Sequence, residues 1–358
     1  MLISALLFFL RASELLPHFQ EITVWVLPGL PLLICALAFG GRAYFYGGAL
    51  KHFEFLEQEA HTAQQAWQTW AQRHLAVHAS CVLLPDRVCA SSLAQPGASL
   101  PASTGEARRI LELPLLVQDR AQVALELLFS ALEPVLQLLP ADSSLRLTLL
   151  SDVDPLQYDA LIETFQLTWG RASRRPCPEI VSLAAELSPR WVDEKLKNAS
   201  AAFELILVLQ VLGETAYSDG LAAMLLSPDS IAHEQGLPVL AGLLRPMPLD
   251  IDKIEADLQL FLHTQKAAFQ AVGLLADAVR GQASARRIMA ASFAQKASLD
   301  ARKHWILESL CGPTGPLGNW LSAALAVEVA RYQQQPLLML ATDRSQHWIS
   351  TVTTGDSA

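Results

Sequence analysis

The chain has 358 residues, of which 52% are hydrophobic and only 17% charged, and its net charge is −9. This length suits one large domain or two ordinary ones, and the apolar excess predicts a large core or a membrane segment. A general nucleic-acid-binding protein is excluded because it needs a dense basic surface, whereas the arginine pairs here are scattered. The five cysteines are irregularly spaced and form no C-x-x-C pair, so we expect neither a disulfide framework nor a structural zinc site.

The N-terminal region contains a candidate membrane anchor. Residues 22–41 are free of charge and long enough to cross the hydrocarbon core as one helix, and aromatic residues lie close to both ends. The alternative is a buried hairpin. Residues 1–16 are expected to form an interfacial or membrane-dipping helix. The distribution of basic residues and the free cysteines favour a single-pass protein of a bacterial inner membrane whose soluble part faces the cytoplasm.

Residues 53–78 lack Gly and Pro, which predicts a helix with one apolar stripe. The stripe comprises Phe53, Leu56, Ala60, Ala63, Trp67 and Trp70. We expect it to pack on the chain's own domain in preference to a partner. His74 and His78 are four residues apart on this helix, a spacing that suits a metal, but the glutamate of H-E-x-x-H is missing and surface histidines are favoured. A mobile linker is predicted for residues 91–105.

From Ile110 onward, short apolar runs alternate with longer helical ones, which is typical of βαβ units. Strands are predicted at 110–117, 145–153, 179–187, 205–212, 221–226 and 237–244, with helices at 122–139, 154–169 and 189–199. Further on, we predict helix at 251–280, a strand at 287–292, helices at 298–310 and 321–332, and a closing hairpin of strands 336–342 and 347–353. The region divides into two halves of similar size, residues 110–245 and 250–355.

Several groups of residues are candidates for catalysis or metal binding. Glu214 and Asp219 flank Ser218 in the polar turn GETAYSDG, where an acid–base pair or the start of a metal site is the alternative to ordinary turn residues, which we favour. Cys311 precedes a Gly-rich loop and is a candidate nucleophile with His304 or His263 as base, against a packed small residue.

The segment GPTGPLG has the glycine content of a phosphate-binding loop. It lacks the Lys-Ser/Thr ending of a P-loop and the spacing G-x-G-x-x-G, which favours a structural turn. We therefore assign no catalytic, cofactor-binding or metal-binding residue, and we expect no cofactor.

Two long stretches carry a resemblance to a known family. ELILVLQVLGETAYSDGLAAMLLSP followed by AHEQGLPVLAGLLRP is similar to the central strand, turn and hairpin of a β-ketoacyl synthase, and CGPTGPLGNWLSAALAVEVARYQQQPLLML is similar to the Gly-rich loop, Ala-rich helix and penultimate strand of its second half. The resemblance to this thiolase-like superfamily implies a layered α-β-α-β-α domain built from two related βαβαβ halves, here preceded by a transmembrane helix.

The expected organisation is therefore a membrane anchor (1–50), an amphipathic helix and linker (51–105), a first α/β half (106–245) and a second (246–358). The family's dimers also imply a homodimer.

The catalytic pattern of the family is not matched. Its synthases place a nucleophilic cysteine at a helix start in the first half, where this chain has Ser188, and the HGTGT motif of the second half is missing. Gly312 and Gly315 match glycines of the family's second Gly-rich loop. Asn319 corresponds only loosely to the segment that carries a histidine in the family. The resemblance thus implies a non-catalytic thiolase-like pseudo-enzyme that acts as an adaptor in an envelope assembly such as a type VI secretion system; the alternative is an acyl-transfer enzyme with a displaced nucleophile.

Overall fold

The computed structural model of the chain describes residues 26–95, 105–140, 142–198, 202–344 and 346–355, together with residues 5, 6, 9 and 12. The chain divides into two compact units, residues 1–67 and residues 68–358. Most of the segment predicted as an N-terminal interfacial helix, residues 1–16, lies outside the described residues, as do residues 22–25 of the predicted membrane span.

The first unit contains most of the long helix α2, Val26–Gln72. The predicted membrane span and the predicted amphipathic helix therefore form one continuous helix. Two of the described helices, Gly29–Gln72 of α2 and Val117–Leu138, are long and apolar enough to cross a membrane. The second of these, α4, packs its buried side chains on the core of the second unit.

The second unit contains one eleven-stranded mixed sheet with strand order β3-β2-β4-β5-β1-β6-β11-β10-β8-β9, and β7 pairs with β11. Its first five strands are β1 (His74–Leu83), β2 (Leu145–Ser151), β3 (Glu179–Ala184), β4 (Phe203–Gln210) and β5 (Gly220–Pro228). The helices between them are α3 (Ala90–Ala94), α4 (Val117–Leu138), α5 (Tyr158–Ala172) and α6 (Trp191–Lys197), with short 3₁₀ turns at Pro85–Arg87 and Pro155–Gln157.

The remaining strands are β6 (Ala241–Leu244), β7 (Met247–Leu249), β8 (Leu274–Ala276), β9 (His304–Ile306), β10 (Leu337–Asp343) and β11 (Gln346–Thr354). The helices of this part are α7 (Asp229–Gln235), α8 (Ile254–Thr264), α9 (Lys266–Gln270), α10 (Gln282–Ala294), α11 (Leu307–Cys311) and α12 (Gly318–Gln333), with 3₁₀ turns at Ile251–Lys253 and Val279–Gly281.

The sheet is duplicated about the antiparallel pair β1–β6. In the first half the strands run in the order third, second, fourth, fifth, first (β3-β2-β4-β5-β1), and the second half repeats this order as β9-β8-β10-β11-β6. In each half the third, second and fourth strands are mutually parallel, and the fifth is antiparallel to the fourth. The prediction of two related halves is confirmed. The first strand of the first half, however, is β1, which lies before residue 106. The sequence predicts helix for its first residues, 74–78, and a short strand and turn for SCVLLPDRVCA, residues 80–90, which contains its end.

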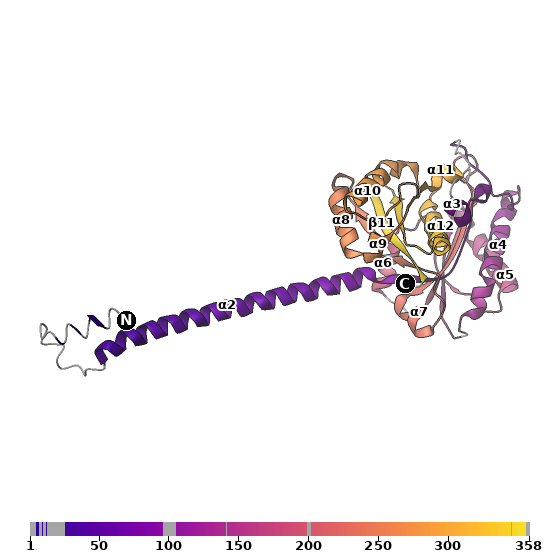
Figure 1. Cartoon of the computed structure of the whole chain (residues 1–358). Helices are drawn as coiled ribbons and strands as arrows, with labels where there is room; N and C mark the ends of the chain where they lie inside the picture. Colours follow the sequence, from indigo (N-terminus) through magenta and orange to yellow (C-terminus); the bar gives the residue numbers. More distant parts are fainter. Residues whose placement is uncertain are drawn as a thin grey trace. The chain divides into compact units, whose positions relative to one another are not determined.

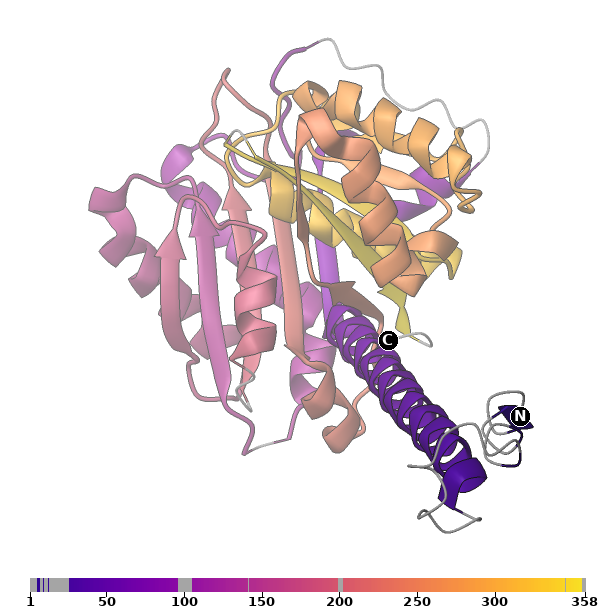
Figure 2. The ribbon, with the colours of Figure 1, turned by 90° about the vertical axis from the view of Figure 1, so that its left-hand side faces the viewer.

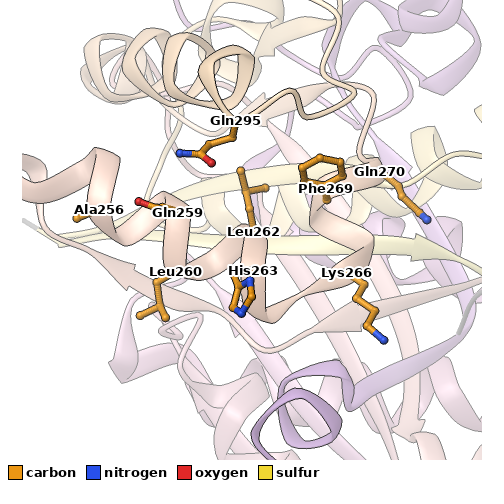
Figure 3. Close-up of a pocket in the computed structure, with 9 residues that line it drawn as sticks. All are labelled: Ala256, Gln259, Leu260, Leu262, His263, Lys266, Phe269, Gln270 and Gln295. Atoms are coloured by element: carbon orange, nitrogen blue, oxygen red, sulfur yellow. The ribbon is translucent and has the colours of Figure 1, made fainter. Parts of the chain in front are cut away.

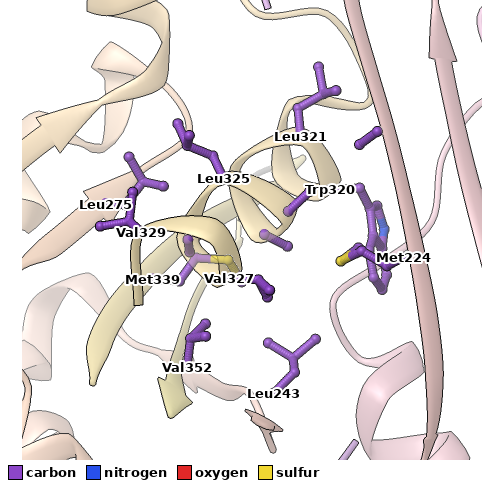
Figure 4. Packing of buried hydrophobic residues seen from close by; sticks show 14 of the residues in the cluster. Met224, Leu243, Leu275, Trp320, Leu321, Leu325, Val327, Val329, Met339 and Val352 are labelled. Atoms are coloured by element: carbon purple, nitrogen blue, oxygen red, sulfur yellow. The ribbon is translucent and has the colours of Figure 1, made fainter. Parts of the chain in front are cut away.

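Helices cover both faces of the two half-sheets and fill the space between them. One core cluster joins α4 and α5 to the outer face of the first half, and another joins α8 and α10 to the outer face of the second half. A third cluster lies between the half-sheets around α12, whose apolar residues are buried on almost every side (Figure 4). Figures 1 and 2 show α4 and α5 on one side of this unit and α8 and α10 on the other. The predicted α-β-α-β-α layering is therefore confirmed.

Several local predictions were wrong because tertiary contacts decide the conformation of a short segment, including the predicted helix 251–280, which contains β8. Residues 110–117 form no strand, because the Ile110 amide donates to Asp219 instead of to a neighbouring strand. The predicted strand 287–292 lies inside α10, and the predicted helix 298–310 contains β9. With only three residues each, β8 and β9 are too short to show a period of two in the sequence.

Candidate functional site

A cleft of about 700 Å³ opens at the carboxyl ends of β8 and β10, where ligands bind in many α/β proteins. We call it the junction cleft because both halves line it. The second half contributes Asp277 to Arg280, Glu308, the Gly-rich loop with the start of α12, and Thr342 to Arg344. The first half contributes Glu186 and Leu187, which follow β3, and Tyr217, which lies between β4 and β5.

Asp277 is the most buried carboxylate of the junction cleft. It follows β8 directly, and its two oxygens accept hydrogen bonds from the backbone amide of Thr342 (2.7 Å) and from the Thr342 hydroxyl (3.1 Å). Burial raises the pKa of Asp277 above its ordinary value, while the hydrogen bonds from Thr342 oppose the rise. The Nδ1 atom of His347, on β11, lies 3.4 Å from the Thr342 hydroxyl on β10.

The duplication shows what Asp277 does. In the first half, Asp152 follows β2, donates its amide to the carbonyl of Leu209 (3.3 Å), and accepts from the amide of Val211 (3.1 Å). In the second half, the Asp277 amide donates to the carbonyl of Leu340 (3.1 Å), and its carboxylate accepts from Thr342, again two residues further along the fourth strand. Each aspartate therefore fastens the end of its second strand to the fourth strand.

Other charged side chains of the junction cleft are less buried than Asp277. Glu308 accepts from the Val279 amide at 2.6 Å, and the exposed Arg344 lies 3.4 Å from Glu186. Arg280 is exposed on the rim. None of the described residues that line the cleft is a cysteine or a histidine, so it holds no thiol or imidazole of the kind that ketosynthase chemistry uses. Carboxylates, guanidinium groups and an amide suit the recognition of a polar surface.

Ser188, at the position where the family places its nucleophile, lies beside the junction cleft. Its carbonyl accepts from the Trp191 amide (3.0 Å) before α6 begins. The carbonyl of the preceding residue, Leu187, accepts from the Asn319 side chain (2.9 Å) and from the indole of Trp320 (2.8 Å). Asn319 therefore holds a first-half loop against the start of α12.

The Gly-rich loop is held by the polar turn between β4 and β5. The Ser218 amide donates to the carbonyl of Pro313 (2.8 Å), and the side chain of Gln210 accepts from the Leu317 amide (3.2 Å). A methyl group added to Gly315 would come within 2.5 Å of the same Gln210 side chain, so only glycine fits there. The amides of Gly312, Leu317 and Gly318 donate inside the protein, and the two prolines of the loop have no N–H, so the structure favours the structural turn over a phosphate-binding loop.

The turn itself is anchored by a buried ion cluster. Asp219 accepts from the guanidinium groups of Arg109 (2.7 Å) and Arg120 and from the Ile110 amide (3.0 Å). The Asp219 side chain is fully buried, and Glu214 is exposed. Asp219 and Ser218 thus act as turn residues, as favoured from the sequence.

Cys311 ends α11 and is buried beneath the Gly-rich loop. Burial raises the pKa of its thiol to about 12, and the nearby charges that modify this pKa come from Arg108 and Asp86. The two predicted bases lie on other elements, His304 on β9 and His263 on α8, and the cysteine has neither of them among the charges that shift its pKa.

The prediction that His74 and His78 lie on one helix is wrong. His74 and His78 lie on β1, since α2 ends at Gln72. The ring of His78 is buried, with Nδ1 2.9 Å from the carbonyl of Pro238 and Nε2 2.8 Å from the hydroxyl of Ser227. Among the residues the structure describes, no group of three His, Cys, Asp or Glu side chains could hold a metal ion.

A second hollow, of about 790 Å³, lies on the outer helices of the second half. Leu260 and His263 of α8, Lys266 and Phe269 of α9, and Gln295 after α10 line it (Figure 3). It is formed by surface helices and not by strand ends, and it brings together no pair of groups placed for chemistry.

Comparison with known proteins establishes the fold. No family model and no curated protein matches the sequence. Among solved structures, the ishigamide ketosynthase/chain length factor covers 79% of this chain and all of its own, with a TM-score of 0.54 at 10% identity. The ketosynthase of a type II polyketide synthase, solved with its acyl-carrier protein and bound to the hexaketide, covers 79% of this chain and 99% of its own (TM-score 0.52, 11% identity).

A third similar structure is the oxazolomycin ketosynthase domain OzmH KS8 of Streptomyces albus JA3453, which covers 80% of this chain and 97% of its own (TM-score 0.51, 13% identity). At these identities the likeness concerns the fold. The chain has the thiolase-like fold of the ketosynthases.

Sequence reasoning missed most of the junction cleft. Asp277 and Arg280 follow β8, in a segment whose sequence predicts a long helix. Thr342 lies in the final hairpin, for which the sequence predicts a strand but no binding role. A signal was present: Asp277 follows a short apolar run directly and Asp152 follows one after a single serine, positions typical of strand-end residues in βαβ units.

Proposed function

We propose that this chain is a membrane-tethered protein of thiolase-like fold that binds another protein through its junction cleft and forms no covalent acyl intermediate. The observation that carries the proposal is the lining of that cleft, where carboxylates, arginines and Asn319 occupy the place between the two halves. A covalent thioester needs a thiolate, and burial makes the Cys311 thiolate unfavourable.

The tether is the N-terminal part of α2. Its support is the uninterrupted helix from Val26, the absence of charge through Gly41, and the exposure of large apolar side chains such as Leu33, Leu37 and Phe39. We place the protein in a bacterial inner membrane as a single-pass protein, with residues 68–358 in the cytoplasm and a component of an envelope machine such as a type VI secretion system as its partner. From the family resemblance we also expect a homodimer.

A pull-down from native membranes tests the binding role. Full-length protein with Arg280→Glu and Arg344→Glu, both on the cleft rim, should lose its partner, because two charges of the recognised surface are reversed. The matched control, Arg171→Glu with Arg174→Glu, reverses two exposed arginines on the outer side of the first half and should retain the partner. Equal recovery with both variants, or no stable partner for the wild type, would contradict the proposal.

The rival function is acyl transfer, which the ketosynthase fold favours. Purified protein incubated with acyl-CoA or acyl-carrier-protein thioesters, and examined by intact-mass spectrometry beside an active ketosynthase, separates the two. We expect no acyl adduct on the wild type. An acyl adduct that forms on the wild type and disappears in Cys311→Ala or Ser188→Ala would show that the protein is an acyl-transfer enzyme and refute the proposed non-catalytic role.

A further inference from the structure

The part of α2 that follows the apolar segment carries a strict heptad pattern. Apolar residues recur at alternating intervals of three and four: Tyr46, Ala49, Phe53, Leu56, Ala60, Ala63 and Trp67. This gives a mean spacing of 3.5 residues over three heptads, which keeps one stripe facing a partner helix in a left-handed coiled coil. In heptad letters, Tyr46, Phe53, Ala60 and Trp67 occupy the a positions, and Ala49, Leu56 and Ala63 the d positions.

We call these seven residues the α2 seam. Its large side chains are exposed: Phe53 by 63%, Leu56 by 51% and Trp67 by 53%. The stripe predicted from the sequence ran from Phe53 to Trp70, and its packing on the chain's own domain stays a prediction for residues 53–67. The next a/d position, Trp70, is different, because the guanidinium group of Arg245 lies 4.3 Å from its ring centroid. Trp70 belongs to the second unit, whereas the seven seam residues belong to the first.

We propose that the α2 seam pairs with the same seam of a second copy of this chain, as a parallel, in-register, two-stranded coiled coil. The parallel direction rests on the proposed membrane tether. If the apolar part of the same helix crosses the bilayer, two copies enter it in the same direction and their seams start at the same depth. Confinement to the membrane also raises the effective concentration of one seam near another.

The flanking residues suit self-pairing. In a parallel pair, His52 at a g position faces Glu57 at the following e position of the second copy, and Glu59 faces Gln64. Neither contact sets like charges against each other. The f positions, on the far side of the helix, are Lys51, Gln58 and Gln65.

The seam contains both bulky and small layers, and two of its aromatic layers each have an alanine layer before them. The aromatic a layers at Phe53 and Trp67 follow the alanine d layers at Ala49 and Ala63. An in-register pair therefore places each pair of large rings next to a layer that leaves room for them.

Cysteine cross-linking in membranes tests the pairing. The exposed native thiols are first removed from the full-length protein by Cys35→Ala, Cys89→Ala and Cys177→Ala. Ala60→Cys or Ala63→Cys is then introduced at the seam, and Gln58→Cys or Gln65→Cys at f positions as matched controls. Facing a and d residues lie within the Cα separation a disulfide spans, whereas f residues do not. After mild oxidation we expect at least a fivefold larger disulfide-linked dimer fraction for the two seam positions than for the two controls.

Each outcome decides the proposal. Cross-linking at both seam positions supports a parallel, in-register pair, because an antiparallel pair brings only one position close to itself. Equal cross-linking at seam and control positions, no cross-linking at the seam, or a photo-cross-linker at Leu56 that captures a different protein would overturn it. Carbonate extraction of the same membranes tests the tether separately, and a chain released by carbonate with its seam cross-link intact would refute the tether and keep the pair.

Discussion

Removing the Asp219 carboxylate should weaken the second unit strongly. In Asp219→Ala, the buried guanidinium of Arg120 loses its anionic partner, and Arg109 and the Ile110 amide lose an acceptor. Breaking a buried ion pair by removing one partner costs about 3–5 kcal/mol, because the remaining charge stays buried and unpaired. For a unit of this size we expect the midpoint of thermal unfolding, Tm, to fall by roughly 5–8 °C.

The assay is thermal unfolding of the full-length protein in detergent, followed by tryptophan fluorescence. Glu214→Gln is the matched control, since it removes a carboxylate from the same turn but at an exposed position. We expect the control to shift the Tm by less than about 2 °C, as surface substitutions do. The same small shift for Asp219→Ala would refute the view that this ion cluster anchors the turn beneath the Gly-rich loop.

Three further outcomes are expected. Gly315→Ala should destabilise the protein by about 1–3 kcal/mol through overpacking, whereas Gly170→Ala, which meets open space in α5, should be neutral or slightly stabilising; unfolding curves of both check this. Burial raises the pKa of Asp277, so the folded state binds its proton more tightly than the unfolded state, and stability is lost as the pH rises through the interval between the two pKa values. Asp277→Asn should therefore gain stability relative to wild type at pH 7 compared with pH 4, and a difference independent of pH would contradict this. Cys89 is exposed, and a hydrogen bond with the Ser91 hydroxyl lowers the pKa of its thiol, whereas burial raises the pKa of Cys311 to about 12. Peptide mapping after treatment with iodoacetamide at pH 7.5 should therefore show that Cys89 is alkylated at least about 100-fold faster than Cys311. Similar rates would show that the Cys311 thiol is accessible and ionised.

Long elements of the fold could be predicted from the sequence because their patterns are unambiguous. The buried strand β4, its partner β5, the Ala-rich helix α12 and the final hairpin all form within a few residues of their predicted bounds. Continuous apolar runs bounded by turn residues leave few alternatives for such segments.

The junction cleft could not be predicted in the same way. Asp277 to Arg280 follow β8 and Glu308 comes soon after β9, and these strands of three residues each depend on neighbouring strands for their hydrogen bonds. The start of β1 could not be predicted either, because its first residues have the same helix-favouring composition as the end of α2. Where a strand's identity depends on partners far away in the chain, local periodicity carries little information.

The central place of β1 has a consequence for how the protein is made. This strand is hydrogen-bonded to β5 on one side and to β6 on the other, yet it is the first strand of the sheet to leave the ribosome. Its first partner, β5, begins at Gly220, more than 130 residues later. At about 5–20 residues per second, β1 waits roughly 7–30 s for a partner. The strand that forms the middle of the finished sheet is thus an unpaired apolar segment while the chain is being made. We expect it to need protection from aggregation until β5 and β6 have been synthesised.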